Sequence, residues 1–200
     1  MCEEGSLFKF IEENEYVSNC VSNEKKDFNS LSYLIDKDKK LSQSDCIKMG
    51  HGIENVFTDI ILSKSGKKLT NIKRKNTKGK KETDHLFLDE ENKTIYYAEL
   101  KSNLNLDTEK CKSTSEKCIL IEKELNEIYD GYNVNMYLLG LRYYEKSLIP
   151  KTISKKYENI HTNVIGVNEY FDLLNIDYQF KDEEEYKQFL NFMAFKLFDK

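Results

Sequence analysis

Two short stretches, 82–89 (ETDHLFLD) and 94–101 (TIYYAELK), constrain the fold of this chain more than any other feature of its sequence. Both are rich in aromatic and branched residues, which favour β-strands. The polar link Glu90-Glu91-Asn92-Lys93 between them is typical of a hairpin connection. The sequence therefore predicts two neighbouring antiparallel strands in the middle of the chain.

The register of this hairpin decides which charged residues meet. If the link turns tightly at its centre, Asp84 lies opposite Glu99. Side chains alternate between the two faces of a strand, so Glu99 then shares a face with Lys101, and Ala98 and Leu100 lie on the other face. The pattern predicts that two carboxylates and a lysine converge at one end of the hairpin.

Such a convergence has two interpretations. Like charges directly opposite on a sheet are destabilising, by up to roughly 1 kcal/mol. A divalent cation removes this repulsion, because carboxylate oxygens are preferred ligands of Mg²⁺, and a neighbouring lysine can orient a water or neutralise a phosphate. The alternative is a surface hairpin with solvated charges and a register slipped by one. Residue types alone leave both open.

The spacing resembles a known signature. Asp84, followed fifteen positions later by Glu99-Leu100-Lys101 on an apolar strand, resembles the D…(D/E)-X-K signature of the PD-(D/E)XK nuclease superfamily. The surroundings are most similar to a small type II restriction endonuclease. Asp84 lies in Thr-Asp-His rather than after a proline, a departure that many members share. The similarity covers roughly residues 45–175 and is most specific at the hairpin.

The resemblance implies a fold and an activity. The expected fold is mixed α/β, with a central sheet begun by a three-strand antiparallel meander and flanked by helices. The expected activity is Mg²⁺-dependent, site-specific hydrolysis of phosphodiester bonds in double-stranded DNA, as in restriction-modification. Asp84, Glu99 and the Leu100 carbonyl would hold Mg²⁺, and Lys101 would orient the attacking water. A repair, nicking or junction-resolving nuclease and an inactive DNA-binding module are the alternatives.

The resemblance also suggests a fourth catalytic residue and an assembly. Several restriction endonucleases carry an additional acid on the helix before the hairpin, and Glu54 is the matching candidate, although it also suits an exposed helix position. A chain of 200 residues fits one nuclease domain, with a helical part at 1–44, a catalytic core at 45–175 and a terminal helix at 176–200. We expect a homodimer acting on a near-symmetric site.

Charge is unevenly distributed along the chain. The formal net charge is −4, but the segment between Ser63 and Lys81 contains no acid. Its basic residues are Lys64, Lys67, Lys68, Lys73, Arg74, Lys75, Lys78, Lys80 and Lys81. Beside a metal-binding hairpin, this cationic segment is typical of contact with phosphate backbones, whereas alone it suits a solvated lysine-rich hairpin. We expect the residues from Lys73 to Lys81 to contact DNA.

The segment after the hairpin offers polar groups for the same partner. Asn103, Asn105 and Asp107 share one face if this segment is extended, and asparagine can bond adenine edges bidentately. Alternatively, Asp107 caps the next helix and the asparagines face water. Both interpretations stay open at this point.

Composition excludes several other classes. No apolar run approaches the roughly 18 residues of a membrane span, and the acidic start Met1-Cys2-Glu3-Glu4-Gly5 is unlike a signal peptide. We therefore expect a cytoplasmic protein without membrane contact. Five cysteines without CxxC spacing favour free thiols over disulfides or zinc. No phosphate-binding glycine loop is present, so no nucleotide cofactor is expected.

Apolar periodicity completes the expected elements. Helices are expected within 1–44, from 43 to about 62 with an interruption at Gly50-His51-Gly52, and at 108–130, 169–174 and 186–198. Further strands are expected at 69–75, 134–141 and 163–167, the second lying parallel to 94–101 after a helical crossover. Cys111, Thr114, Cys118, Ile121, Leu125 and Ile128 form the predicted buried stripe of the 108–130 helix.

Overall fold

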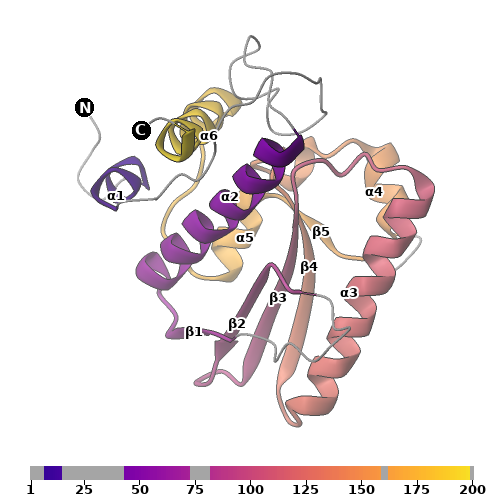
Figure 1. Cartoon of the computed structure of the whole chain (residues 1–200). Coiled ribbons are helices and arrows are strands. Elements are labelled where there is room, and N and C mark those ends of the chain that lie inside the picture. The colour runs from indigo at the N-terminus through magenta and orange to yellow at the C-terminus, as the bar shows by residue number, and fades with distance from the viewer. Residues whose placement is uncertain (1–6, 15–42, 73–81, 159–161, 199–200) are drawn as a thin grey trace. The chain divides into compact units, whose positions relative to one another are not determined.

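The computed structural model describes residues 7–14, 43–72, 82–158 and 162–198 of the chain (Figure 1). The fold divides into two compact units. One unit contains α1 (Leu7–Glu13), most of α2 (Gln43–Lys64) and α6 (Glu183–Phe198). The other spans residues 64–178 and contains the sheet. The expectation of one domain stays a prediction.

The second unit is built on a five-stranded mixed sheet in the order β1-β2-β3-β4-β5. Its strands are β1 (Leu69–Asn71), β2 (His85–Asp89), β3 (Thr94–Lys101), β4 (Asn133–Gly140) and β5 (Val164–Ile165). The first three are antiparallel neighbours, whereas β4 runs parallel to β3 and β5 parallel to β4 (Figure 1). The mixed α/β class, the antiparallel meander and the parallel fourth strand are thus confirmed.

The hairpin has the predicted register, because His85 pairs with Ala98 and Asp89 with Thr94. Asp89 is buried at the start of the turn and accepts hydrogen bonds from the Asn92 backbone nitrogen at 3.1 Å and side-chain nitrogen at 2.9 Å. Lys93 adopts a positive φ of 45°, which closes the link. The strand predicted at 82–89 begins only at His85, so Asp84 lies in a bend just before it.

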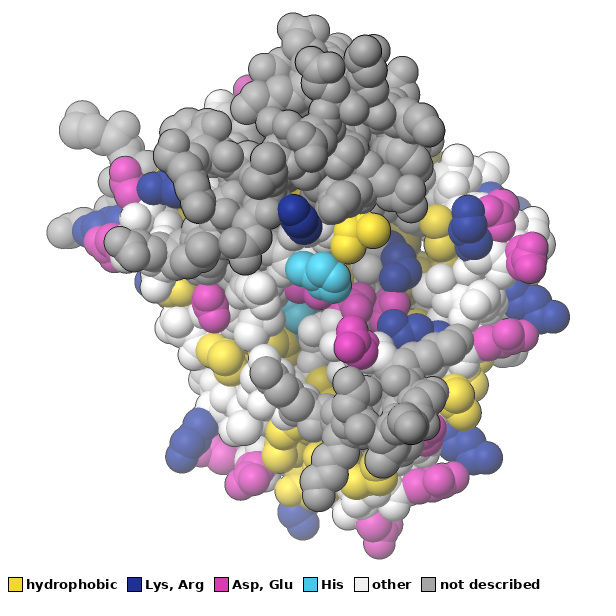
Figure 2. All heavy atoms as spheres, in the orientation of Figure 1, with side chains coloured by type: hydrophobic (Ala, Val, Ile, Leu, Met, Phe, Trp, Pro, Cys, Tyr) yellow, Lys and Arg dark blue, Asp and Glu magenta, His cyan; other side chains and the backbone are white. Residues whose placement is uncertain are grey.

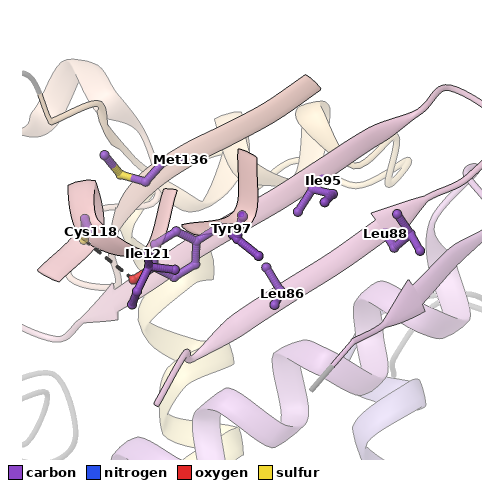
Figure 3. Packing of buried hydrophobic residues seen from close by; sticks show 8 residues of the cluster. Leu86, Leu88, Ile95, Tyr97, Cys118, Ile121 and Met136 are labelled. Atoms are coloured by element: carbon purple, nitrogen blue, oxygen red, sulfur yellow. Dashed lines mark hydrogen bonds between the residues drawn. The ribbon is translucent and has the colours of Figure 1, made fainter. Parts of the chain in front are cut away.

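One face of the sheet packs against α3 (Thr108–Ile128). The apolar contacts join side chains from three strands to the buried stripe of the helix (Figure 3). The cluster consists of Leu86, Leu88, Ile95, Tyr97, Cys118, Ile121, Leu125 and Met136. The predicted stripe was wrong at two positions: Ser115 is buried in place of Thr114, and Ile128 is 59% exposed because it lies at the end of the helix.

Helix α5 (Val167–Leu173) packs against β4 and meets the other face of the hairpin. Its Tyr170 stacks on the His85 ring, with centroids 5.9 Å apart, and its hydroxyl lies 3.2 Å from His85 Nδ1. Both side chains are buried. Buried polar groups need partners, and here a histidine and a tyrosine supply them to each other.

Two short elements on either side of Pro150 were not predicted. A short 3₁₀ turn covers Lys146–Leu148, and α4 spans Lys151–Glu158. Proline is favoured at helix starts because it has no N–H to leave unpaired, and the Pro150 carbonyl accepts from Ile153 N at 2.8 Å. Only Ile153 and Tyr157 of this helix are buried, so its apolar periodicity was too sparse to predict it.

Helix α2 runs without interruption from Gln43 to Lys64, so the predicted break at Gly50-His51-Gly52 was wrong. Buried apolar residues continue at helical spacing on both sides of the glycines, namely Met49, Ile53, Val56, Phe57, Ile60 and Ile61. Their packing outweighs the glycine penalty of about 1 kcal/mol per residue. Within the same unit, Phe57 and Phe8 each lie edge-on to Phe189.

Helix α1 lies within the helical part expected at 1–44, most of which falls outside the described residues, as do residues 73–75 of the strand expected at 69–75. The remaining predicted elements that lie within the described residues are present, most of them with shifted ends. Helix α5 begins two residues earlier than predicted, and β5 is shorter than the strand expected at 163–167. Helix α6 begins at Glu183 rather than at 186, because acidic residues suit a helix N-terminus and Asp182 Oδ1 accepts from Glu185 N at 2.9 Å. No helix within the described residues combines the length and apolar character needed to cross a bilayer.

Candidate active site at the end of the hairpin

The candidate site is centred on Glu99, near the end of β3. Its side chain is only 2% exposed and lies on the sheet face that α3 covers. Lys101, two residues along the same strand, reaches Glu99 Oε1 with its Nζ at 2.7 Å. The shared face predicted from strand alternation is therefore observed as a direct ion pair.

A second lysine, Lys117 of α3, was not predicted. Its Nζ lies 2.7 Å from Glu99 Oε1 and 2.6 Å from Oε2. The Lys117 side chain is 17% exposed, compared with 30% for Lys101. Lys117 precedes Cys118, which belongs to the buried stripe of the helix. A charged residue at the edge of this stripe was the only feature of the sequence that could have indicated a role for Lys117. Its pairing with a residue 18 positions away arises from tertiary packing.

Asp84, in the bend just before β2, reaches the end of the neighbouring strand β3. Its Oδ2 accepts a hydrogen bond from the Leu100 backbone nitrogen at 2.7 Å. In an extended strand, the N–H and C=O of one residue point toward the same neighbour. The Leu100 carbonyl therefore points toward the Asp84 side of β3. The three groups expected to hold a metal thus gather around residues 99–100.

Tyr97 completes the surroundings of the carboxylate. It lies two residues before Glu99 on the same face, fully buried, and its hydroxyl donates to Glu99 Oε2 at 3.2 Å. The same hydroxyl lies 3.8 Å from the Cys118 sulfur (Figure 3). Cys118 and Cys111 are free buried thiols, as predicted.

Electrostatics at the site favour the ionised forms of Glu99 and Lys101. Burial opposes ionisation of Glu99, but the charges of Lys101 and Lys117 and their hydrogen bonds outweigh it, so the Glu99 pKa lies below its ordinary value. Burial likewise opposes the charge of Lys101, whose pKa is nevertheless raised by Glu99 and, to a smaller extent, by Asp84. Burial and the neighbouring Glu99 charge raise the Cys118 pKa to about 11. This thiol is therefore a poor nucleophile.

The donor set fits a hard divalent ion. Carboxylates and a backbone carbonyl are oxygen ligands of the kind that Mg²⁺ takes, usually together with several waters. Within the described ranges, no three His, Cys, Asp or Glu side chains are grouped to hold a metal. The candidate site supplies two such side chains, Asp84 and Glu99, and one carbonyl. It therefore resembles the sparse protein ligation typical of Mg²⁺ rather than a closed zinc site.

Glu54 lies on α2, in the other unit, and its role stays a prediction. Its Oε2 lies 3.3 Å from His51 Nδ1, one turn earlier on the same helix. The side chains of His51 and Glu54 are 66% and 26% exposed. His51 is thus a helix residue rather than the loop residue expected from its glycine neighbours.

The predicted DNA contacts are only partly within the structure. Lys73, Arg74, Lys75, Lys78, Lys80 and Lys81 lie outside the described residues. Asn103 Oδ1 accepts from the Asn105 backbone nitrogen at 2.9 Å, and Asn105 Oδ1 lies 3.3 Å from Lys156 Nζ. Asp107 caps α3 by accepting from Lys110 N at 2.8 Å, as one of the two interpretations expected.

Surface charge outside the candidate site is mixed. On the face drawn in Figure 2, lysine or arginine side chains and acidic side chains of the described residues are interspersed. Electrostatic attraction to a polyanion would therefore have to come from local clusters rather than from the whole face. The lysine-rich segment at 73–81 is the strongest such cluster in the sequence.

Comparison of the chain with family models, curated proteins and solved structures gives no match. The functional assignment therefore rests on the residues themselves and on their geometry.

Proposed function

We propose that this protein is a Mg²⁺-dependent endonuclease that hydrolyses phosphodiester bonds in double-stranded DNA, in the manner of a type II restriction endonuclease. One observation carries the proposal. Asp84, Glu99 and Lys101, the three residues of the signature, gather at the end of the β2–β3 hairpin, linked by the Asp84–Leu100 hydrogen bond and the Glu99–Lys101 ion pair. The desolvation penalty of a buried ion pair can exceed the free energy gained from the attraction between its charges, so stability alone gives little reason to keep a charged carboxylate here.

The residues have separable roles in the proposed reaction. Asp84, Glu99 and the Leu100 carbonyl would hold Mg²⁺. When bound, this ion polarises the scissile phosphate and lowers the pKa of the attacking water. Lys101, still 30% exposed, is placed to orient that water or to neutralise charge that develops on the phosphate. The family resemblance implies products with 5′-phosphate ends.

The order of elements supports the same proposal. The resemblance implies a helix, three strands, a helix and a strand, and the chain has α2, β1 to β3, α3 and β4 in that order. The proposed site lies at the end of β3, where the antiparallel meander meets the parallel part of the sheet. The lysine-rich segment between β1 and β2 would contact backbone phosphates, which position the duplex without specifying its sequence.

A second candidate is an inactive DNA-binding module, and one observation favours it. Both Glu99 oxygens already have ammonium partners, as in a purely structural ion-pair network. Activity measurements separate the two candidates, because an inactive module would bind DNA without cleaving it. A repair or junction-resolving nuclease would cleave, but not at fixed positions of a plain duplex, and a nicking nuclease would cut one strand only.

The test is incubation of the purified protein with plasmid DNA and Mg²⁺, followed by sequencing of the fragment ends. We expect cuts at fixed positions, loss of cutting with EDTA, and loss of cutting in Asp84→Ala, Glu99→Ala and Lys101→Ala while DNA binding survives. Lys112→Ala is the matched control, since Lys112 lies on α3 with a side chain that is 71% exposed. Full activity in all three site variants would reject the assignment.

The proposed assembly is a homodimer on a near-symmetric DNA site. Two copies related by a two-fold axis would each cut one strand, so the sequenced sites should be palindromic or nearly so. Sedimentation equilibrium of the protein alone and with its cleaved site measures the stoichiometry. A single copy bound to an asymmetric site would replace this assembly with a monomeric or nicking enzyme.

A further inference from the structure

Lys117 holds the Glu99 carboxylate in a way that Lys101 does not. Its ammonium contacts both carboxylate oxygens, at 2.7 Å and 2.6 Å, whereas Lys101 contacts Oε1 alone at 2.7 Å. The two lysines also come from different elements, since Lys101 lies on β3 and Lys117 on α3. Lys117 is therefore placed by helix packing rather than by the hairpin.

The acceptor capacity of Glu99 is filled. An ionised carboxylate offers about four lone-pair sites. Glu99 receives one contact from Lys101, two from Lys117 and one from the Tyr97 hydroxyl. A metal ion can therefore use this carboxylate only if at least one of these donors withdraws.

The geometry identifies which donor must withdraw. Tyr97 is fully buried in the apolar cluster, so its side chain has less freedom to move than either lysine, whose side chains are partly exposed. Withdrawal of Lys101 would free a site on Oε1 alone, whereas withdrawal of Lys117 would free a site on each oxygen. A divalent ion needs the same oxygen electrons and carries the same sign of charge, so it and the Lys117 ammonium exclude each other.

We propose that Lys117 is a positioning residue that acts as the resident counter-ion of Glu99 and is displaced when a divalent metal ion binds. This inference rests on the proposed function, because it takes Glu99 as a metal ligand. Lys117 keeps the buried carboxylate ionised and in place without metal, and it weakens metal binding by competition. Its removal should tighten metal binding, which is the opposite of what loss of a purely structural residue would do.

The experiment measures Mn²⁺ binding without DNA, by electron paramagnetic resonance of the free ion. Mn²⁺ accepts the same oxygen ligands as Mg²⁺. We expect Lys117→Met to bind Mn²⁺ about tenfold or more tightly than the wild type, the effect of one hydrogen bond to a charged group. Lys117→Arg keeps the charge and should bind like the wild type. Lys112→Met, on the exposed side of α3, is the matched control and should also be unchanged.

Thermal unfolding gives a second readout that does not depend on activity. Without metal, Lys117→Met should melt below the wild type, because Glu99 loses a counter-ion. Saturating Mn²⁺ should raise its melting temperature more than that of the wild type, because tighter binding stabilises the native state more. A Lys117→Met protein that unfolds in purification is replaced by Lys117→Gln, which keeps a hydrogen-bond donor.

The outcomes distinguish this inference from the proposed function. Tighter binding in Lys117→Met, or binding there alone, supports displacement. Equal or weaker binding in Lys117→Met, with clear binding in the wild type, overturns the role of Lys117 and leaves the metal site standing. No binding in either protein overturns both proposals. In cleavage assays, displacement predicts that Lys117→Met needs less Mg²⁺ for its half-maximal rate.

Discussion

The two faces of the β2–β3 hairpin bury polar groups in different ways. On the α3 face, Glu99 is ionised and held by two lysines. On the other face of the hairpin, His85 is partnered by Tyr170 through ring stacking and a 3.2 Å contact. The second arrangement pairs a buried imidazole with a tyrosine hydroxyl. The first maintains a buried charge that a well-packed apolar residue could replace, often without loss of stability.

The difference indicates that the α3 face is the one on which charged groups are kept at a cost in stability. Glu99 is buried, yet one of its partners, Lys101, is 30% exposed and so open to solvent and to ligands. His85 and Tyr170 are both buried. If this distinction is functional, substitutions on the α3 face should change activity more than stability, and substitutions on the other face should do the reverse.

The largest expected effect is that of Glu99→Gln, which keeps the side-chain shape and removes its charge. We expect Mg²⁺-dependent cleavage to fall at least about a hundredfold, as when a group that stabilises transition-state charge is removed. The free energy of unfolding should fall by about 2 kcal/mol, because hydrogen bonds from charged ammonium groups then meet a neutral amide. Single-turnover cleavage and urea unfolding measure the two effects, and undiminished cleavage would place the chemistry elsewhere.

A matched pair of tyrosines gives the next effect. Tyr97 and Tyr170 are both fully buried, and each donates or shares a hydrogen bond, with Glu99 and His85 respectively. Each change to phenylalanine should lower the free energy of unfolding by about 1 kcal/mol, the net contribution of a hydrogen bond. Only Tyr97→Phe should also slow cleavage, because it loosens the Glu99 carboxylate. Equal cleavage rates in the two variants would remove the distinction between the faces.

The smallest effect is expected at the start of α3, the helix that carries Lys117. Asp107 accepts from Lys110 N, and hydrogen bonds from Lys110 lower the pKa of its carboxyl. A lowered pKa means that its stabilising contribution is present at neutral pH and is lost as pH falls below its ordinary value of about 4. Asp107→Ala should therefore melt slightly below the wild type at pH 7, and the difference should shrink at pH 3. A difference that grows in acid would contradict the cap.

The local sequence was sufficient to predict the hairpin and the face of β3 that carries Glu99 and Lys101. The strand 94–101 was predicted with the bounds that the structure shows, because aromatic and branched residues dominate it and because Asp89 and Asn92 define the turn. Alternation then placed Glu99 and Lys101 on one face. The helix break at Gly50 was predicted wrongly, since two glycines are weak signals against six buried apolar residues that pack along α2.

Other features could not be predicted from local sequence patterns. Lys117 meets Glu99 only because α3 crosses the sheet at that point, and a lysine beside Cys118 gives no register between helix and strand. Helix α4 has just two buried residues, so it depends on tertiary contacts. The pairing of Asp84 with the Leu100 N–H was also unexpected, because Asp84 was assigned to the strand and lies just before it.

The most direct test of the central claim is a crystal structure of the protein with Mn²⁺, located by its anomalous scattering. We predict an ion about 2.0–2.6 Å from oxygens of Asp84 and Glu99 and from the Leu100 carbonyl, with Lys117 withdrawn from Glu99. Crystals in saturating Mn²⁺ with both lysines still on Glu99 and no ion beside Asp84 would contradict it.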